Sequence, residues 1–164
     1  MPTEYNLYNL EASFRKYLVA EKVSSITLRN YLSDFRYFCG WIESTSYRLI
    51  ILNSMQELVV EISKLLSIIR LSEYKDYLQS NKLPIKTINR RLSTLRKFCS
   101  FCISQGWLKE NPAKQLQNVK TADFLRVKLD SSLSEFSEIH PEMFEDVREF
   151  YSIISLQTYV QNKG

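Results

Sequence analysis

The chain has 164 residues, 45% of them hydrophobic, with only three Gly and four Pro. This composition excludes disordered and collagen-like chains and favours long helices around a real core. No apolar run approaches the roughly 20 residues that span a bilayer, no signal peptide opens the chain, and three cysteines are too few for a disulfide scaffold. We therefore expect a cytoplasmic protein with no membrane partner.

Charge is distributed unevenly behind a net value of +4. Residues 1–60 are balanced, whereas residues 61–120 carry twelve basic and four acidic side chains and residues 121–164 carry four basic and eight acidic ones. Residues 81–100 hold six basic side chains and no acid. A local positive field of this kind indicates a polyanionic partner.

Apolar residues at three- and four-residue spacing predict a series of helices before Gly106. Ser24 or Ser25 offers an N-cap for the second helix. A break is predicted within the third near Arg70–Ser72, because Ser72 with Glu73 resembles a fresh helix start. Pro84 and Gly106 bound the last one, because proline disfavours helix before it and glycine suits the position after a helix end. The predicted helices span residues 4–21, 24–43, 54–78 and 86–105.

The pattern changes after Gly106. Residues 107–113 predict a turn that leads into a short helical piece, and residues 117–130 are the best linker candidate. His140 and Pro141 then resemble the start of an acidic amphipathic helix. This tail could be a solvated helix, could close the bundle, or could dock on a neighbouring copy or on the basic face. We therefore expect one domain over residues 1–120, and a linker with a helical tail over residues 121–164.

Two of these segments repeat each other. Thr27–Ile42 and Thr87–Cys102 match at a constant offset of 60 positions, with identical Thr, Leu, Ser, Arg, Phe and Cys residues. At 100° per residue, each segment separates an apolar arc from a polar and basic arc. Arg91 lies at the edge of its apolar arc, so we expect it either to snorkel to the surface or to reach a carboxylate or carbonyl group, rather than to point freely outward. Cys99 and Cys102 are spaced C-x-x-C but fall on the apolar arc, which predicts buried thiols and no metal site.

The outward arcs combine cations with short hydroxyl and amide side chains. Arginine and lysine neutralise phosphates, while hydroxyls and amides bond phosphate oxygens or base edges. A simpler interpretation is that these faces are only solvated. If they bind DNA, the candidate residues are Thr27, Arg29, Ser33, Arg36, Lys86, Thr87, Asn89, Arg90, Ser93, Arg96 and Lys97.

The order of these motifs resembles the tyrosine recombinase core-binding domain, the SAM-like N-terminal domain of phage integrases. The resemblance covers roughly residues 8–120 and implies an all-α bundle of four or five SAM-like helices, here followed by an extra helical tail. It also implies that the helices at 25–43 and 86–105 approach the DNA major groove. The matching segments are Ser25–Leu28, Tyr31–Phe35, Phe38 to Trp41, Tyr74–Leu78, Thr87–Phe98, Gly106-Trp107 and Asn111–Ala113.

The chemistry of that family belongs to a second domain, for which about 44 residues after Lys120 are too few. His140 is the only histidine and lacks the family's His-x-x-Arg spacing, so no catalytic residue, cofactor, metal or small-molecule ligand is expected. The prediction is double-stranded DNA binding in DNA integration or site-specific recombination, without catalysis. A recombinase catalytic domain or a neighbouring protomer is a possible protein partner. The alternative is a helical protein-interaction or regulatory module that kept the fold but not DNA binding.

Overall fold

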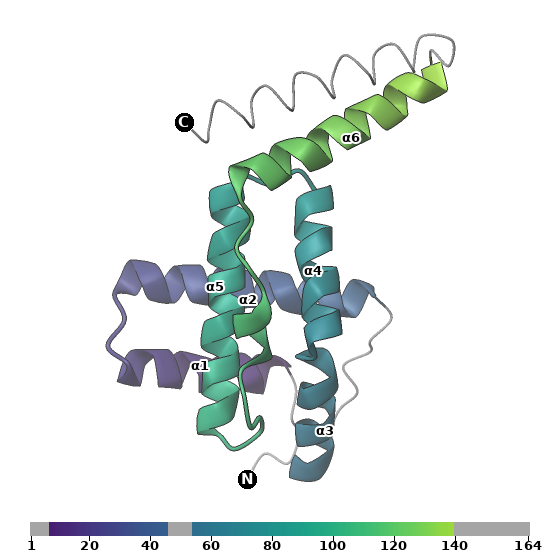
Figure 1. Cartoon of the computed structure of the whole chain (residues 1–164). Coiled ribbons are helices and arrows are strands. Elements are labelled where there is room, and N and C mark those ends of the chain that lie inside the picture. Colours follow the sequence, from purple (N-terminus) through teal and green to yellow (C-terminus); the bar gives the residue numbers. More distant parts are fainter. Residues whose placement is uncertain (1–6, 46–53, 140–164) are drawn as a thin grey trace. The chain divides into compact units, whose positions relative to one another are not determined.

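The computed structural model describes residues 7–45 and 54–139, which contain helices and connecting turns only (Figure 1). The all-α prediction is therefore confirmed. The chain divides into two compact units, Met1–Val119 and Lys120–Gly164. The described elements are α1 (Leu7–Ala20), α2 (Ser25–Ser44), α3 (Met55–Leu65), α4 (Ile68–Ser80), α5 (Ile85–Ser104), the 3-10 turn η1 (Pro112–Gln115) and α6 (Thr121–Ile139).

The first unit is built from two helical hairpins. α1 and α2 run side by side as one hairpin, and α4 and α5 form a second hairpin that crosses the first (Figure 1). α5 packs on both helices of the first hairpin, and α3 packs on α4. Residues 107–119, here called the strap, return along α5 and contact it and α4 through η1.

Serine side chains start three of these helices. The hydroxyls of Ser24, Ser54 and Ser67 accept hydrogen bonds from backbone N–H groups in the first turns of α2, α3 and α4. The predicted starts near Ser24 and Ser54 are confirmed. The predicted break near Ser72 is wrong, because the chain leaves helix at Leu66 and restarts after the Ser67 cap.

The core lies between the two hairpins and confirms both predicted apolar arcs. Phe14 of α1 is fully buried against Phe35 of α2 and Phe98 of α5. The buried apolar residues of α2 and α5 are Leu32, Phe35, Phe38, Cys39, Trp41, Ile42, Ile88, Leu92, Leu95, Phe98, Cys99, Phe101 and Cys102. At about 25 cal/mol per Å² of apolar surface, these large side chains are the main source of stability.

The second unit contains α6, which begins at Thr121. The predicted linker at residues 117–130 is therefore wrong from Thr121 onward. Leu125 of α6 is exposed. The predicted helix start at His140 lies outside the described residues. Within the described residues, none of the helices is long and apolar enough to cross a membrane.

Candidate nucleic-acid interface

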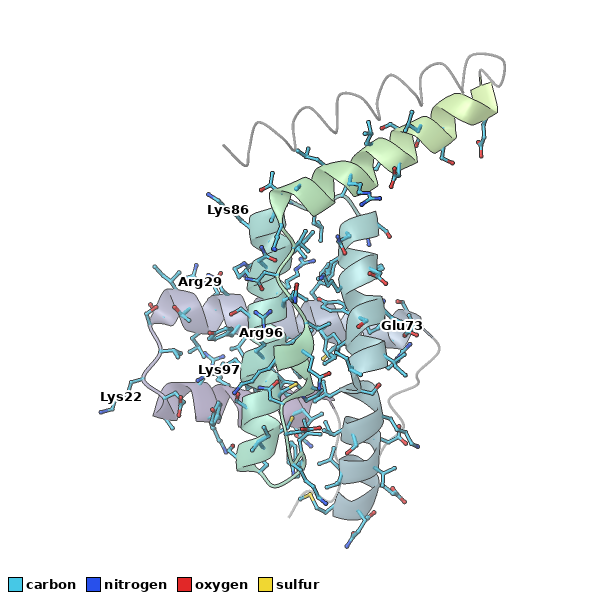
Figure 2. The ribbon with its side chains drawn as sticks, in the orientation of Figure 1. Lys22, Arg29, Glu73, Lys86, Arg96 and Lys97 are labelled. Carbon is cyan, nitrogen blue, oxygen red and sulfur yellow. The ribbon has the colours of Figure 1, made fainter. Side chains whose placement is uncertain are left out.

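The predicted DNA-contacting residues lie on α2 and α5, as expected from their helical spacing. Helices place residues three, four and seven positions apart on one face, so Arg29, Ser33 and Arg36 align on α2. Lys86, Arg90, Ser93 and Lys97 align on α5 in the same way. Figure 2 shows Lys22, Arg29 and Lys86 extending from one side of the first unit, with Glu73 on the opposite side. The two stripes therefore contribute to one basic face.

Two of the predicted cations on this face are open to solvent. Arg29 and Lys86 are exposed, and within the described residues neither takes part in an ion pair. Ser33 and Ser93 are exposed beside them. A solvated cation without a carboxylate partner can neutralise a phosphate without first breaking a contact. Within the described residues, these four side chains are the exposed part of the predicted site that no ion pair engages.

Two further predicted cations carry carboxylate partners on or next to α1. Arg36 Nε donates to Glu11 Oε2 at 2.9 Å, and Lys97 Nζ donates to Glu21 Oε2 at 2.8 Å. The hydrogen bond to each carboxylate raises the pKa of Arg36 and of Lys97 above its ordinary value. Lys97 also lies 5.3 Å from the ring centre of Tyr17. Both cations must release or share an acid before they can bind a phosphate.

Asp34 is a buried carboxylate between α2 and α5 that the sequence analysis did not identify. Its side chain is 2% exposed, and Arg90 Nη2 and Arg91 Nε lie 3.0 and 3.7 Å from Oδ1. Thr94 Oγ1 donates to Oδ2 at 3.0 Å. Burial raises the pKa of Asp34 above its ordinary value, against the opposing effects of Arg90, Thr94 and Arg91.

This cluster confirms that Arg91 reaches a carboxylate. Its guanidinium carbon also lies 3.4 Å from the ring centre of Tyr37, which explains how a cation is accommodated at the edge of the apolar arc. Arg90 is different, because its side chain is 40% exposed while one end touches Asp34. The neighbouring arginines thus divide into one interior residue and one residue that reaches from Asp34 to the surface. A signal for Asp34 did exist in the sequence, since it is the only acid in Thr27–Ile42 and matches Thr94 at the 60-residue offset.

The strap engages the remaining side of α5. Asn89 makes a reciprocal pair with Val119, donating to its carbonyl at 3.0 Å and accepting from its N–H at 2.8 Å. Arg96 Nη2 donates to the Leu116 carbonyl at 2.6 Å and to Asn118 Oδ1 at 2.8 Å. Asn89 and Arg96 were predicted as DNA contacts, but in this structure their polar groups hold the strap.

The two predicted threonines are half-buried at helix starts. Thr27 Oγ1 lies 2.8 Å from Ser24 Oγ, so its hydroxyl belongs to the cap of α2. The Thr87 N–H donates to the Pro84 carbonyl at 2.9 Å in the first turn of α5. Thr27 and Thr87 therefore shape the helix entries, and their hydroxyls are less accessible than those of Ser33 and Ser93.

The cysteines show the environment of core residues. Cys39, Cys99 and Cys102 are buried free thiols, and burial raises the pKa of Cys39 and of Cys99 to about 12. A thiolate, the form that binds metal, is disfavoured under these conditions. Among the described residues, no group of three or more His, Cys, Asp or Glu side chains could hold a metal ion.

One family model matches this chain over residues 12–106. Its description is phage integrase, N-terminal SAM-like domain. The match runs from within α1 to just beyond the end of α5, which is more than half of the chain, and it includes both helices of the basic face. Neither the curated proteins nor the solved structures contain a significant match.

Proposed function

The chain belongs to the family of phage integrase N-terminal SAM-like domains, and we propose that it binds double-stranded DNA through the basic face of α2 and α5. Membership in this family indicates a role in site-specific recombination. The observation that carries the DNA proposal is the position of two exposed cations, Arg29 and Lys86, on the two helices that share this face; neither has an ion-pair partner in the part of the chain that the structure describes.

The physical basis of this binding is phosphate neutralisation. Lys86, Arg29 and the exposed end of Arg90 meet the backbone first, and Ser33 and Ser93 add hydroxyl groups between them. Arg36 and Lys97 can also bind phosphates once their ion pairs with Glu11 and Glu21 are broken. Asn89 and Arg96 keep the strap in place, so Ser93 is the remaining candidate on α5 for a contact with a base edge. The proposal assigns no catalytic role to any residue of this chain, and strand cleavage would come from a separate recombinase catalytic domain.

Duplex binding measured over a range of salt concentrations tests this proposal. We expect the logarithm of affinity to fall linearly with the logarithm of salt, with a slope of about −0.9 for each phosphate neutralised. Arg29→Gln combined with Lys86→Gln should reduce the steepness of this slope by about 1.8. Lys109→Gln combined with Lys114→Gln is the matched control, since it removes the same charge from exposed positions in the strap.

Equal slopes for the two double variants would show that the positive charge acts only through the net charge of the protein. Absence of duplex binding by the wild type would overturn the proposal itself. The domain would then be better explained as a protein-interaction module that kept the family fold.

A further inference from the structure

The 60-residue repeat extends beyond the matching sequence to two complete helical hairpins. The first residues of α2 and α5 are 60 positions apart, and so are their last residues. The last residues of α1 and α4, Ala20 and Ser80, are separated by the same 60 positions. Most of α1 and α4 show little sequence identity. The same 60-residue offset nevertheless pairs Phe14 with Tyr74, Tyr17 with Tyr77 and Leu18 with Leu78.

Local backbone features repeat at the same offset. Lys22 and Lys82 follow the ends of α1 and α4 in left-handed conformations, with φ values of 55° and 54°. The N–H of each donates to a carbonyl three residues earlier at 3.0 Å. At the far ends, the hydroxyls of Ser44 and Ser104 both donate to the carbonyl three residues earlier at 2.7 Å. The two hairpins therefore share turns as well as helices.

The contacts between the hairpins show how they are related. Phe14 of α1 meets Phe98 of α5 with ring centres 5.2 Å apart at 81°, and the equivalent residues, Tyr74 of α4 and Phe38 of α2, meet at 4.9 Å and 74°. The pair of Phe14 with Phe101 is matched in the same way by Tyr74 with Trp41.

The first helix of each hairpin thus packs against the second helix of the other: α1 contacts α5, and α4 contacts α2. An operation that exchanges the halves in this reciprocal way is a twofold rotation, the relation found in isologous dimers. A residue on such an axis meets its own equivalent, and Thr94 Oγ1 does donate to Asp34 Oδ2 one repeat away. The approximate twofold axis of the first unit therefore passes between Asp34 and Thr94.

We propose that this approximate twofold axis is used in DNA recognition, with Lys22 and Lys82 binding phosphates on opposite strands of one duplex. The inference rests on the proposed function and adds to it a geometry and two residues. The antiparallel strands of B-form DNA are related by twofold axes perpendicular to the duplex, and twofold proteins align with such axes. Two equivalent hairpins on one axis then meet two equivalent strands.

The lysines of the two interhelical turns support that arrangement. Lys22 and Lys82 are exposed at equivalent positions, and neither has an ion-pair partner among the described residues. Lys22 extends from the same side of the unit as Arg29 and Lys86 (Figure 2). The α1–α2 and α4–α5 turns adjoin the first halves of α2 and α5, which carry Arg29 and Lys86 (Figure 1).

The test compares Lys22→Gln, Lys82→Gln and their combination on a duplex of about 25 base pairs, with Lys109→Gln as the control. Each single variant should bind about three- to ten-fold more weakly at 0.1 M salt and lose about 0.9 of the salt slope, and the combination should lose about 1.8. A second duplex carries uncharged methylphosphonates along one strand. Only one of the two lysines can then contact a charged strand, so the double variant should lose only about 0.9 of the salt slope.

The outcomes separate this inference from the proposed function. A loss of about 1.8 on the half-neutral duplex would place both lysines on one strand and overturn the twofold arrangement. An effect of only one lysine, or of neither, on the fully charged duplex would also overturn it, while leaving DNA binding through α2 and α5 intact. If the wild type does not bind duplex DNA, both proposals fail together.

Discussion

The Lys97–Glu21 contact leads to a quantitative prediction: Glu21→Gln should raise the affinity for duplex DNA. Lys97 cannot bind a phosphate fully while Glu21 Oε2 lies 2.8 Å from its Nζ. The side chains are 25% and 47% exposed, so water screens the pair substantially and limits its contribution to about 0.5–1 kcal/mol. Removing the competing charge should therefore strengthen binding about two- to five-fold at 0.1 M salt.

The assay is fluorescence anisotropy with a labelled duplex of about 25 base pairs at fixed salt. Glu73→Gln is the matched control, because Glu73 pairs with Arg70 at 2.6 Å and lies on the opposite side of the unit (Figure 2). This variant measures the general effect of removing one negative charge. Combining Glu21→Gln with Lys97→Gln completes a double-mutant cycle, in which most of the gain should disappear.

Three results would contradict this reasoning. If Glu21→Gln and Glu73→Gln raised affinity equally, Glu21 would act only through net charge. If Glu21→Gln weakened binding, the ion pair would be needed to hold Lys97 toward the DNA, and the carboxylate would be a positioning group. A gain that persisted without Lys97 would likewise assign the effect to another cation.

Three further predictions concern the parts that support this face. Asn89→Ala should lower the free energy of unfolding by about 1–3 kcal/mol in chemical denaturation, because the Val119 N–H and carbonyl lose their partners, and it should leave DNA affinity nearly unchanged. Because burial raises the pKa of Asp34, the folded state binds a proton at Asp34 more strongly than the unfolded state does. This preferential protonation stabilises the folded state at low pH, and the stabilisation is lost as pH rises from 3.8 through the folded-state pKa. The unfolding free energy of the wild type relative to Asp34→Asn should therefore fall across that window in a pH series, and a rise would refute the assignment. Cys99, with a pKa of about 12, presents about one thiolate in ten thousand at pH 8, so a thiol reagent should label it far faster in denaturant than in buffer.

The sequence predicted the interior of the first unit better than its surface. Helical spacing assigned Leu92, Leu95 and Phe98 to the core, and all three are buried. This prediction was possible because the apolar arc of a helix is defined by the residues of that helix alone. The same spacing left only Arg91 in an ambiguous position, and its contact with Asp34 resolves that position. The starts at Ser24 and Ser54 could be predicted because a cap bonds to its own first turn.

The partners of the outward side chains could not be predicted in this way. Helical spacing shows that Arg36 and Lys97 point away from the core, but it does not show that Glu11 and Glu21 lie beside them. Those contacts depend on how α1 packs against α2 and α5, which is a tertiary property. Asn89 is engaged for the same reason, because its partner Val119 lies 30 residues further along the chain. Predicting a binding surface from a helical wheel therefore overestimates the number of accessible groups.

The approximate symmetry of the first unit explains why its two halves carry different residues at their centre. Two aspartates at the positions of Asp34 and Thr94 would place like charges in contact inside the protein. Two threonines would leave Arg91 without a carboxylate. With one acid and one hydroxyl, Thr94 donates a hydrogen bond to Asp34, and Asp34 lies within ion-pair distance of Arg90 and Arg91. Unequal residues at the twofold axis therefore avoid both problems. Lys22 and Lys82 lie on the solvent side, where no such conflict arises, and there the two halves carry the same residue in the same left-handed conformation.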